Sequence, residues 1–404
     1  VAVRRLAPRA AAFLLAVVIG VGLPAMLAPA LLADERVSAM LERLDARQQH
    51  EFRNWHAAQQ KHGAELDAYW DAVEKTRTER RRKLRAGQPV GPGDYIMTFP
   101  PEYDGPKLSA DIARIWDQLK PLVEPKPIPT VADVLESAKT VYGFVPERIP
   151  EREFKRRYAL EALANGLSKE QVVRVYALET GGLGTHDMQS GINPVTKRGT
   201  PISTALGYAQ LLHANSVSEL VKHGATFIAR LETTAKTPGL GSARAATLRK
   251  KAQVLRRMLA NARKVPNEWS AHMRFAATRN GLGIHALNLD GDIGPMLQVM
   301  KLRGVREIAE KAGRATLTPA ELELMNLAGP STGLEMMSPL GRAAPTSNFF
   351  SRGGYQRNPV VHKRSGAELL AALDSRMDVH VKKEGAVEFA TVFDELMSAR
   401  ASRP

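Results

Sequence analysis

The sequence predicts a mainly α-helical protein. After residue 130 apolar residues recur at spacings of three and four, and no segment shows the alternation expected of a strand. Two helix starts are well marked, because Ser168 to Gln171 forms a capping box and Thr318 is followed by a proline at the first helical position. A hydrophobic content of 44% over 404 residues is enough for a large domain with extensions.

Residues 1–33 predict a secretory signal peptide. Arg4, Arg5 and Arg9 precede an apolar stretch from Ala10 to Leu23, and small residues further on offer a cleavage site. The alternative is an uncleaved amphipathic anchor, because the stretch is short for a membrane span. The paired arginines are also a weak hint of twin-arginine export. The predicted location is the periplasm or another part of the cell envelope.

The net charge and the absence of cysteine limit the kinds of partner that the protein is expected to bind. The chain has no cysteine, so it forms no disulfide and carries no lipid on a cysteine. Its net charge is +15, and +12 without the three arginines of the signal peptide. A basic exported protein suits an anionic partner such as a cell-wall polymer or lipid headgroups, whereas export argues against nucleic acid.

Residues 34–86 predict one long helix, with apolar residues three and four apart and charges between them. The helix ends in the basic run, Arg80 to Arg85. Two interpretations stay open: a coiled-coil-like arm that binds an anionic envelope surface, or a helix packed on the main domain. Residues 87–129 are rich in proline and predict a linker with one short helix from Ser109 to Leu119.

Residues 130–350 predict the main helical domain, and residues 351–404 a C-terminal extension. The helix that starts after Ser168 reaches Glu179 before Gly181 ends it. The helix after Thr318 stops at Gly329, and others are expected over 243–262, 268–279 and 295–302. The stretch 339–361 is rich in Pro, Gly, Ser and Asn, and two more helices follow near 368–373 and 387–399.

Glu179 is the candidate catalytic residue. Cleavage of a glycosidic bond requires a carboxyl group that is still protonated near neutral pH. A glutamate in the last turn of a helix meets the negative end of the helix dipole, and apolar surroundings also disfavour its charged form. The glycines at 181 and 182 leave room for a bulky polymer. The alternative is a solvated surface acid.

A second segment, Ala205 to Leu212, is expected to form a helix packed beside the Glu179 turn. It contains Gly207 and one amide, Gln210, among apolar residues. Gln210 either orients a sugar or satisfies a buried backbone group.

Together these segments resemble the lytic transglycosylase (soluble lytic murein transglycosylase) domain of the lysozyme-like superfamily. That family shows Glu-Ser-x-x-x-x-Pro, then Gly-Leu-Met-Gln, then Ala-Tyr-Asn-Ala-Gly-Pro. The corresponding segments here begin at Glu179, Gly207 and Met325, within a region from about Pro146 to Pro330. An extra stretch, 183–191, follows the first motif, and Asn326 stands where the family has a tyrosine.

The resemblance implies a lysozyme-like fold and cleavage of peptidoglycan glycan strands without a cofactor or metal. Glu179 would protonate the leaving oxygen and then deprotonate the 6-hydroxyl of N-acetylmuramic acid, giving a 1,6-anhydro end. Thr180 and Gln210 would position the glutamate or the sugar. Asn326, or Tyr208 from another side, would replace the family tyrosine. Two rivals are a lysozyme-type hydrolase and a non-catalytic wall-binding or envelope-assembly protein.

No second acid stands beside Glu179 in the sequence, and the nearest is Asp187 on an expected loop. This favours the non-hydrolytic route, because glycoside hydrolases generally use two carboxylates. His186 and Asp187 are interpreted as loop polarity rather than a metal pair. The stretch 281–292 is interpreted as a turn-rich connection, with His285, Asn288 and Asp290 as candidates to line a sugar cleft.

Overall fold

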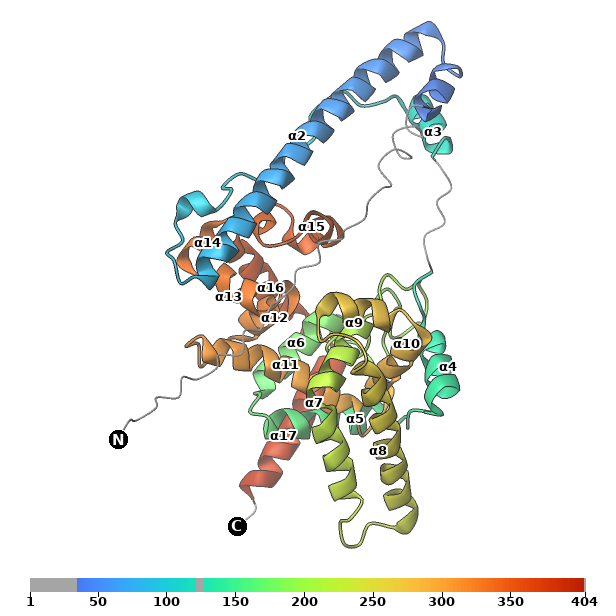
Figure 1. Cartoon of the computed structure of the whole chain (residues 1–404), viewed down its shortest axis with the longest axis vertical. Coiled ribbons are helices and arrows are strands. Elements are labelled where there is room, and N and C mark those ends of the chain that lie inside the picture. Colours follow the sequence, from blue (N-terminus) through green and yellow to red (C-terminus); the bar gives the residue numbers. More distant parts are fainter. Residues whose placement is uncertain (1–34, 121–126, 403–404) are drawn as a thin grey trace, which may run out of the picture.

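The structure is a computed structural model that describes residues 35–120 and 127–402 (Figure 1). Within these residues it contains helices and isolated antiparallel bridges but no strand, which confirms the mainly helical prediction. The predicted signal peptide, residues 1–33, lies outside the described residues. No helix in the described part of the chain has both the length and the apolar character needed to cross a bilayer.

The described helices fall into three consecutive parts of the chain, with long connections over 86–109 and 181–212. The N-terminal part contains α2 (Ala46–Arg85) and α3 (Ala110–Gln118). The main body contains α4 (Val131–Tyr142), α5 (Glu151–Ala164), α6 (Lys169–Thr180), α7 (His213–Thr234), α8 (Ser242–Ala262), α9 (Trp269–Ala276), α10 (Arg279–His285) and α11 (Gly294–Lys311). The C-terminal part contains α12 (Pro319–Ala328), α13 (Pro330–Met336), α14 (Pro339–Ala343), α15 (Arg352–Arg357), α16 (Gly366–His380) and α17 (Glu384–Ala401).

Two large apolar cores hold these helices together. In the first core α6 packs against α5, α12, α16 and α17, around buried aromatic side chains such as Tyr176 and Phe389. In the second core α7 packs against α8, α9 and α10, and α4 packs against α10. Helix α11 contributes to both cores, since Val299 belongs to the first and Leu297 to the second. The last turn of α6 and the facing side of α12 therefore lie in a rigid setting.

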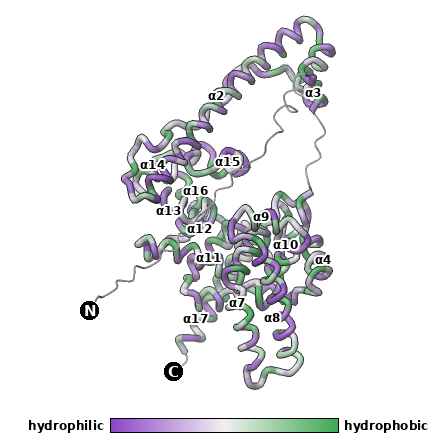
Figure 2. Tube along the Cα trace, in the orientation of Figure 1, coloured by the Kyte–Doolittle hydropathy of each residue, from purple (hydrophilic) through white to green (hydrophobic). Residues whose placement is uncertain are grey.

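The long N-terminal helix starts later than expected. Residues 35–41 form a separate helical segment, and α2 begins at Ala46 after the capping box of Asp45 and Gln48. Hydrophilic positions occur along the whole of α2 (Figure 2), in agreement with a helix that exposes much of its surface. Its far end holds a small apolar cluster with α3, in which Phe52 contacts Ile112 and Met40.

The C-terminal half of α2 is packed on the C-terminal part of the chain. Buried Arg77 donates hydrogen bonds to the carbonyl oxygens of Ser347 at 3.2 Å and Asn348 at 3.1 Å. Trp70 lies against Tyr355 with ring centroids 5.4 Å apart. One half of α2 therefore projects with α3, and the other half is packed on the fold (Figure 1).

Local sequence signals fix the helix ends around the candidate site. Ser168 caps α6 by accepting a hydrogen bond from the backbone N–H of Gln171, and Thr318 does the same for α12. Gly181 ends α6 with a φ of 65°, a left-handed conformation that glycine adopts without strain. Glu179 consequently lies in the last turn of α6, as the sequence predicts.

The segment Ala205 to Leu212 is not the expected helix. Leu206 makes isolated antiparallel bridges with Gln189 and Leu211, and Gly207 has a φ of +77°. A Cβ at Gly207 would lie 2.5 Å from the side-chain nitrogen of Gln298, so close packing also requires glycine here. The apolar run suggested a helix, but a left-handed glycine inside it turns the chain instead.

Candidate active site

The carboxyl group of Glu179 faces helix α12. Asn326, near the C-terminal end of α12, donates a hydrogen bond from Nδ2 to Oε1 of Glu179 at 3.1 Å. The Glu179 residue remains partly exposed, although its carboxyl group is surrounded by protein. The structure thus places Asn326 beside the Glu179 carboxyl group.

A second acid, Glu323, adjoins Glu179. It lies one turn before Asn326 on α12 and is only 3% exposed. The Asn326 amide also donates to Oε2 of Glu323 at 3.3 Å, and the two carboxyl groups are hydrogen-bonded to each other. The expectation that Glu179 has no neighbouring acid is therefore wrong. The partner lies far from Glu179 in the sequence, two residues before the third motif begins at Met325.

Of the two carboxyl groups, Glu323 has the higher pKa and therefore keeps its proton to a higher pH. Burial, followed by the negative charge of Glu179, raises the pKa of Glu323 well above its ordinary value. Protonated Glu323 donates its hydrogen bond to Glu179, and this bond stabilises the ionised form of Glu179. Two like charges in contact do not both ionise easily, so the pair titrates as a unit.

The pKa of Glu179 is raised to about 7. Burial is the largest cause, because it penalises the charged carboxylate. The hydrogen bond from Glu323, the charge of Lys301 and the hydrogen bond from Asn326 act in the opposite direction and keep the pKa from rising further. A pKa raised toward neutral pH suits a group that gives and then takes a proton.

Lys301 of α11 completes the cluster. Its Nζ donates a hydrogen bond to Oδ1 of Asn326 at 2.7 Å, so the amide oxygen of Asn326 points to Lys301 and its nitrogen to the two acids. Burial lowers the pKa of Lys301, whereas the charges of Glu219 and Glu323 raise it. Helices α6, α11 and α12 together fix the position of the Glu179 carboxyl group.

Tyr158 of α5 lies close enough to Glu179 for the charge of Glu179 to affect the pKa of Tyr158. Burial raises the pKa of Tyr158, and the negative charge of Glu179 adds to the effect. Tyr158 is 1% exposed and lies beside Tyr208, with ring centroids 5.6 Å apart. No motif marks Tyr158, because its approach to Glu179 depends on the packing of α5 against α6.

Thr180 and Tyr208 are buried and bonded to other parts of the fold. The Thr180 hydroxyl donates to the carbonyl oxygen of Tyr176 at 2.7 Å, inside α6 itself. The Tyr208 hydroxyl donates to the carboxylate of Glu151. Their hydroxyl groups therefore support the helix and the core, and the structure brings neither hydroxyl to the carboxyl group of Glu179.

Gln210 stabilises the turn in which it lies. Its Nε2 donates to the carbonyl oxygens of Gly207 at 2.8 Å and Met188 at 3.2 Å. Of the two roles left open for this amide, the contacts match the one that satisfies backbone groups.

Asp187 and His186 belong to a charged loop network rather than to a metal or catalytic pair. Burial by itself would raise the pKa of Asp187, but the Thr185 hydrogen bond and the charges of Lys197 and Arg148 outweigh it and lower the pKa to about 2. His186 bonds to Glu151 through Nδ1 at 2.8 Å. Asp187 is thus a stable carboxylate and not a proton donor.

The stretch 281–292 does not line a cleft, contrary to the second interpretation of its polar residues. His285, Asn288 and Asp290 are each 0% exposed. His285 bonds to the carbonyl oxygen of Thr204 at 2.7 Å, and Asp290 pairs with Lys251 at 2.9 Å. These polar groups therefore lie inside the protein and have no access to a polymer. Within the part of the chain that the structure describes, no group of three or more His, Cys, Asp or Glu side chains is arranged to hold a metal ion.

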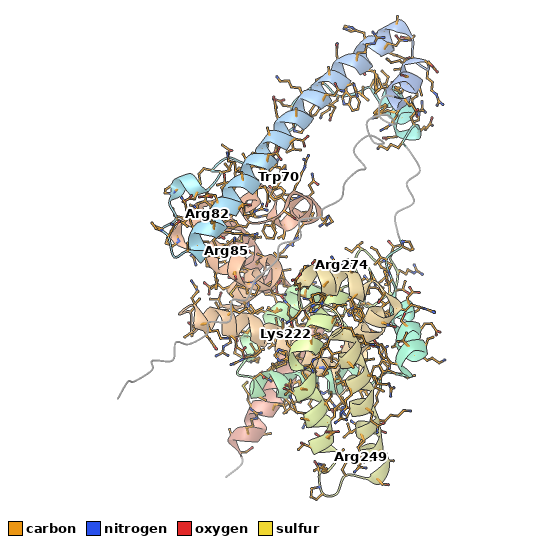
Figure 3. All side chains as sticks on the ribbon, viewed as in Figure 1. Trp70, Arg82, Arg85, Lys222, Arg249 and Arg274 are labelled. Atoms are coloured by element: carbon orange, nitrogen blue, oxygen red, sulfur yellow. The ribbon has the colours of Figure 1, made fainter. Side chains whose placement is uncertain are left out.

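The basic run is only partly available to a ligand. Arg80 is buried and forms an ion pair with Glu335, so it belongs to the fold. Arg82 and Lys83 pair with acids, each at 2.6 Å. Figure 3 places Arg82 and Arg85 at the end of α2. The run as a whole is therefore a weaker binding arm than its sequence suggests.

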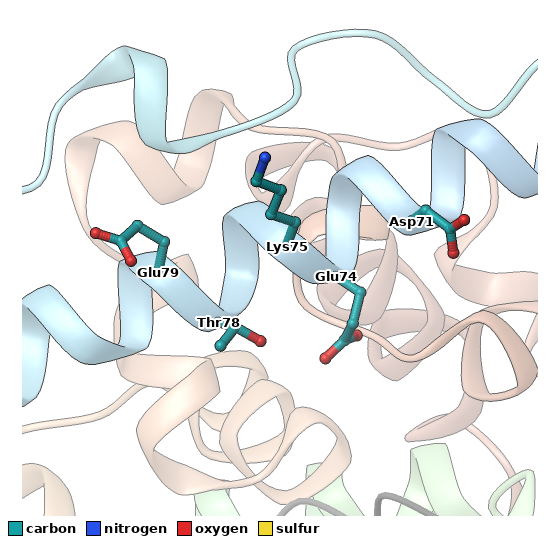
Figure 4. Close-up of a pocket in the computed structure, with 5 residues that line it drawn as sticks. All are labelled: Asp71, Glu74, Lys75, Thr78 and Glu79. Atoms are coloured by element: carbon teal, nitrogen blue, oxygen red, sulfur yellow. The ribbon is translucent and has the colours of Figure 1, made fainter.

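The hollows on the surface do not lead to another catalytic cluster. One, of about 510 Å³, is lined by residues from a single helix (Figure 4): Asp71, Glu74, Lys75, Thr78 and Glu79. Another, of about 620 Å³, lies between α8 and the turn after α4 and includes Phe144 and Lys251. Neither hollow includes Glu179.

Comparison of the chain with protein-family models, with curated proteins and with solved structures gave no match. The function is therefore inferred from the residues of the site and from the three short motifs.

Proposed function

We propose that this protein is a peptidoglycan lytic transglycosylase of the cell envelope with a lysozyme-like catalytic domain. Glu179 would act first as an acid on the glycosidic oxygen between N-acetylmuramic acid and N-acetylglucosamine. It would then act as a base on the 6-hydroxyl of the muramic acid. The leaving sugar takes the proton, the 6-oxygen forms the new bond to the anomeric carbon, and Glu179 recovers a proton.

The observation that carries this proposal is the pKa of about 7 for a partly exposed glutamate at a helix end. An acid–base catalyst works best when its pKa lies near the working pH. Groups with strongly shifted pKa values occur often at functional sites.

The position of Glu323 supports the single-acid route. In retaining glycosidases the two carboxyl groups stand about 5–5.5 Å apart, and in inverting ones about 6.5–9.5 Å apart, with the sugar between them. Glu179 and Glu323 are hydrogen-bonded directly, so no sugar fits between them. Glu323 is also buried beneath Glu179. It can tune the acid, but it cannot attack the sugar or activate a water beside it.

Two rivals remain as outcomes of the test. A lysozyme-type hydrolase would need another carboxylate near the opposite face of the sugar. A non-catalytic wall-binding or envelope-assembly protein would have the same fold but would not cleave the glycan.

The test is the digestion of purified sacculi by the wild type and by Glu179→Gln, followed by mass spectrometry of the released muropeptides. Glutamine keeps the shape and the hydrogen bond from Asn326, but it cannot donate a proton at useful acidity, so we expect a loss of at least about a hundredfold. Glu170→Gln is the matched control, because Glu170 is exposed on the same helix. We expect the products to end in 1,6-anhydro sugars, which are lighter by one water than hydrolytic products.

Reducible ends would instead identify a hydrolase. An inactive wild type that still binds sacculi would support the non-catalytic rival. Full activity of Glu179→Gln would remove Glu179 from the mechanism.

A further inference from the structure

Helix α8 carries a regular row of positive charge. No acidic residue occurs between Glu232 and Glu268. Within this stretch basic residues occur in adjacent pairs seven positions apart: Arg249 and Lys250, Arg256 and Arg257, Arg263 and Lys264. Seven residues are nearly two helical turns, so the first two pairs stay on one side of α8 and lie about 10.5 Å apart along it. The third pair follows in the turn directly after Ala262, the last residue of α8.

This side of α8 faces solvent. All six basic residues of the pairs are exposed, whereas Leu248, Leu255 and Met258 on the other side are buried in the second core. The exposed positions between the pairs are Gln253 and Ala260. We name this surface, with its three basic pairs, the α8 basic face. Figure 3 shows Arg249 on α8 toward the α7–α8 hairpin.

Most of the charge on the α8 basic face has no acidic partner among the described residues. Arg256 pairs with Glu232 at 2.5 Å, and both side chains remain exposed. Arg257 donates a hydrogen bond to the carbonyl oxygen of Tyr142 at 2.6 Å. This bond fixes the position of the guanidinium group but does not neutralise its charge. A row of like charges held on a rigid helix creates a positive potential that attracts anions.

We propose that the α8 basic face binds an extended anionic glycan, namely a peptidoglycan strand with its carboxylate-bearing stem peptides. The choice of strand rests on the proposed function of Glu179. The spacing of the basic pairs supports this choice. A β-1,4-linked disaccharide, which is the unit that bears one stem peptide, is similar in length to two helical turns. Binding at α8 would hold the polymer on the protein while Glu179 cleaves it.

A lipid surface fits this face less well. Helices that lie in the membrane interface insert an apolar side, but the apolar side of α8 is already packed in the core. The α8 basic face exposes no large hydrophobic residue. Attraction to a bilayer would therefore depend on charge alone.

The test compares two variants that each lose four positive charges, both in the Glu179→Gln background so that the polymer stays intact. The α8 variant changes these residues to glutamine: Arg249, Lys250, Arg263 and Lys264. It leaves Arg256 and Arg257, which contact neighbouring helices. The charge-matched control changes these exposed lysines to glutamine: Lys61, Lys75, Lys107 and Lys311.

Co-sedimentation with purified sacculi is measured over a range of salt concentrations, and thermal melting checks that both variants fold. We expect the α8 variant to lose about tenfold or more in affinity at low salt and to show a flatter salt dependence, because exposed charges are screened by salt. The control variant should lose clearly less. Equal losses in the two variants would overturn the proposal.

Vesicles of anionic phospholipid and duplex DNA are tested with the same variants. A loss of binding by the α8 variant that is confined to vesicles or to DNA would assign the face to that partner and refute the glycan. The two proposals fail separately. Sacculus binding without cleavage by the wild type would refute the transglycosylase alone, and cleavage without an α8 effect on binding would refute the docking surface alone.

Discussion

Replacement of Glu323 should shift the pH range in which Glu179 works. Burial raises the pKa of Glu323 well above its ordinary value, and its hydrogen bond to Glu179 stabilises the ionised form of Glu179. Glu323→Leu removes this donor. A hydrogen bond to a charged group contributes about 1.5–3 kcal/mol, and about 1.4 kcal/mol corresponds to one pKa unit, so the pKa of Glu179 should rise by about 1–2 units.

Glu323→Gln is the matched control for this change. The glutamine amide keeps a donor toward Glu179 and carries no charge, like the protonated acid. The pKa of Glu179 should then remain near 7. The two variants therefore separate the hydrogen bond from any general effect of altering α12.

The assay is the rate of muropeptide release from sacculi as a function of pH. Glu179 must be protonated to start the reaction, so activity should fall as the pH rises through the pKa of Glu179. This fall should lie near pH 7 in the wild type and in Glu323→Gln, and at a higher pH in Glu323→Leu. Carbon-13 NMR of labelled glutamate side chains gives the same pKa without a measurement of activity.

A downward shift in Glu323→Leu or in Glu323→Gln would refute the reasoning. It would mean that Glu323 is ionised in the native protein and that its negative charge, rather than its proton, sets the pKa of Glu179. No shift in Glu323→Leu would mean that the two acids do not interact in solution.

Two further predictions concern stability. The pKa of Glu179 is higher in the folded protein than the ordinary 4.5, so the folded state binds more protons. The free energy of unfolding should therefore fall as the pH rises from about 4.5 to 7. Urea titrations should show Glu179→Gln about 1–3 kcal/mol more stable than the wild type above pH 7 and similar to it below pH 4.5. In the same assay Arg80→Ala should lower the free energy of unfolding by about 3–5 kcal/mol, because it leaves Glu335 without its buried partner. Arg85→Ala should change it by less than about 0.5 kcal/mol. Equal effects of the two substitutions would contradict the different roles assigned to these arginines.

The helix ends around the site could be predicted because their causes are local. Ser168 and Thr318 each bond to a backbone group three residues away, and Gly181 supplies a left-handed residue within the same turn. The position of Glu179 follows from these signals alone. The contact of Asn326 with Glu179 could be anticipated only from the order of the motifs.

The residues that were missed depend on contacts between distant segments. Glu323 follows Leu322 in an apolar helix, and nothing within that helix shows that it meets another acid 144 positions earlier in the chain. Tyr158 approaches Glu179 because α5 packs on α6. The sequence leaves open whether the basic run binds a surface or packs on the main domain, and only the pairing with distant Glu335 shows that Arg80 is buried.

The difference in exposure between the two acids assigns their roles. A buried pair of carboxyl groups costs stability, and apolar side chains of similar volume would fill the same space at less cost. Glu323 is 3% exposed and has no access to a polymer, whereas Glu179 reaches the surface. Under the proposed function, a substrate would therefore exchange a proton only with Glu179. Glu323, which holds its own proton more tightly, keeps Glu179 close to its midpoint at neutral pH, where loss and recovery of a proton are both easy.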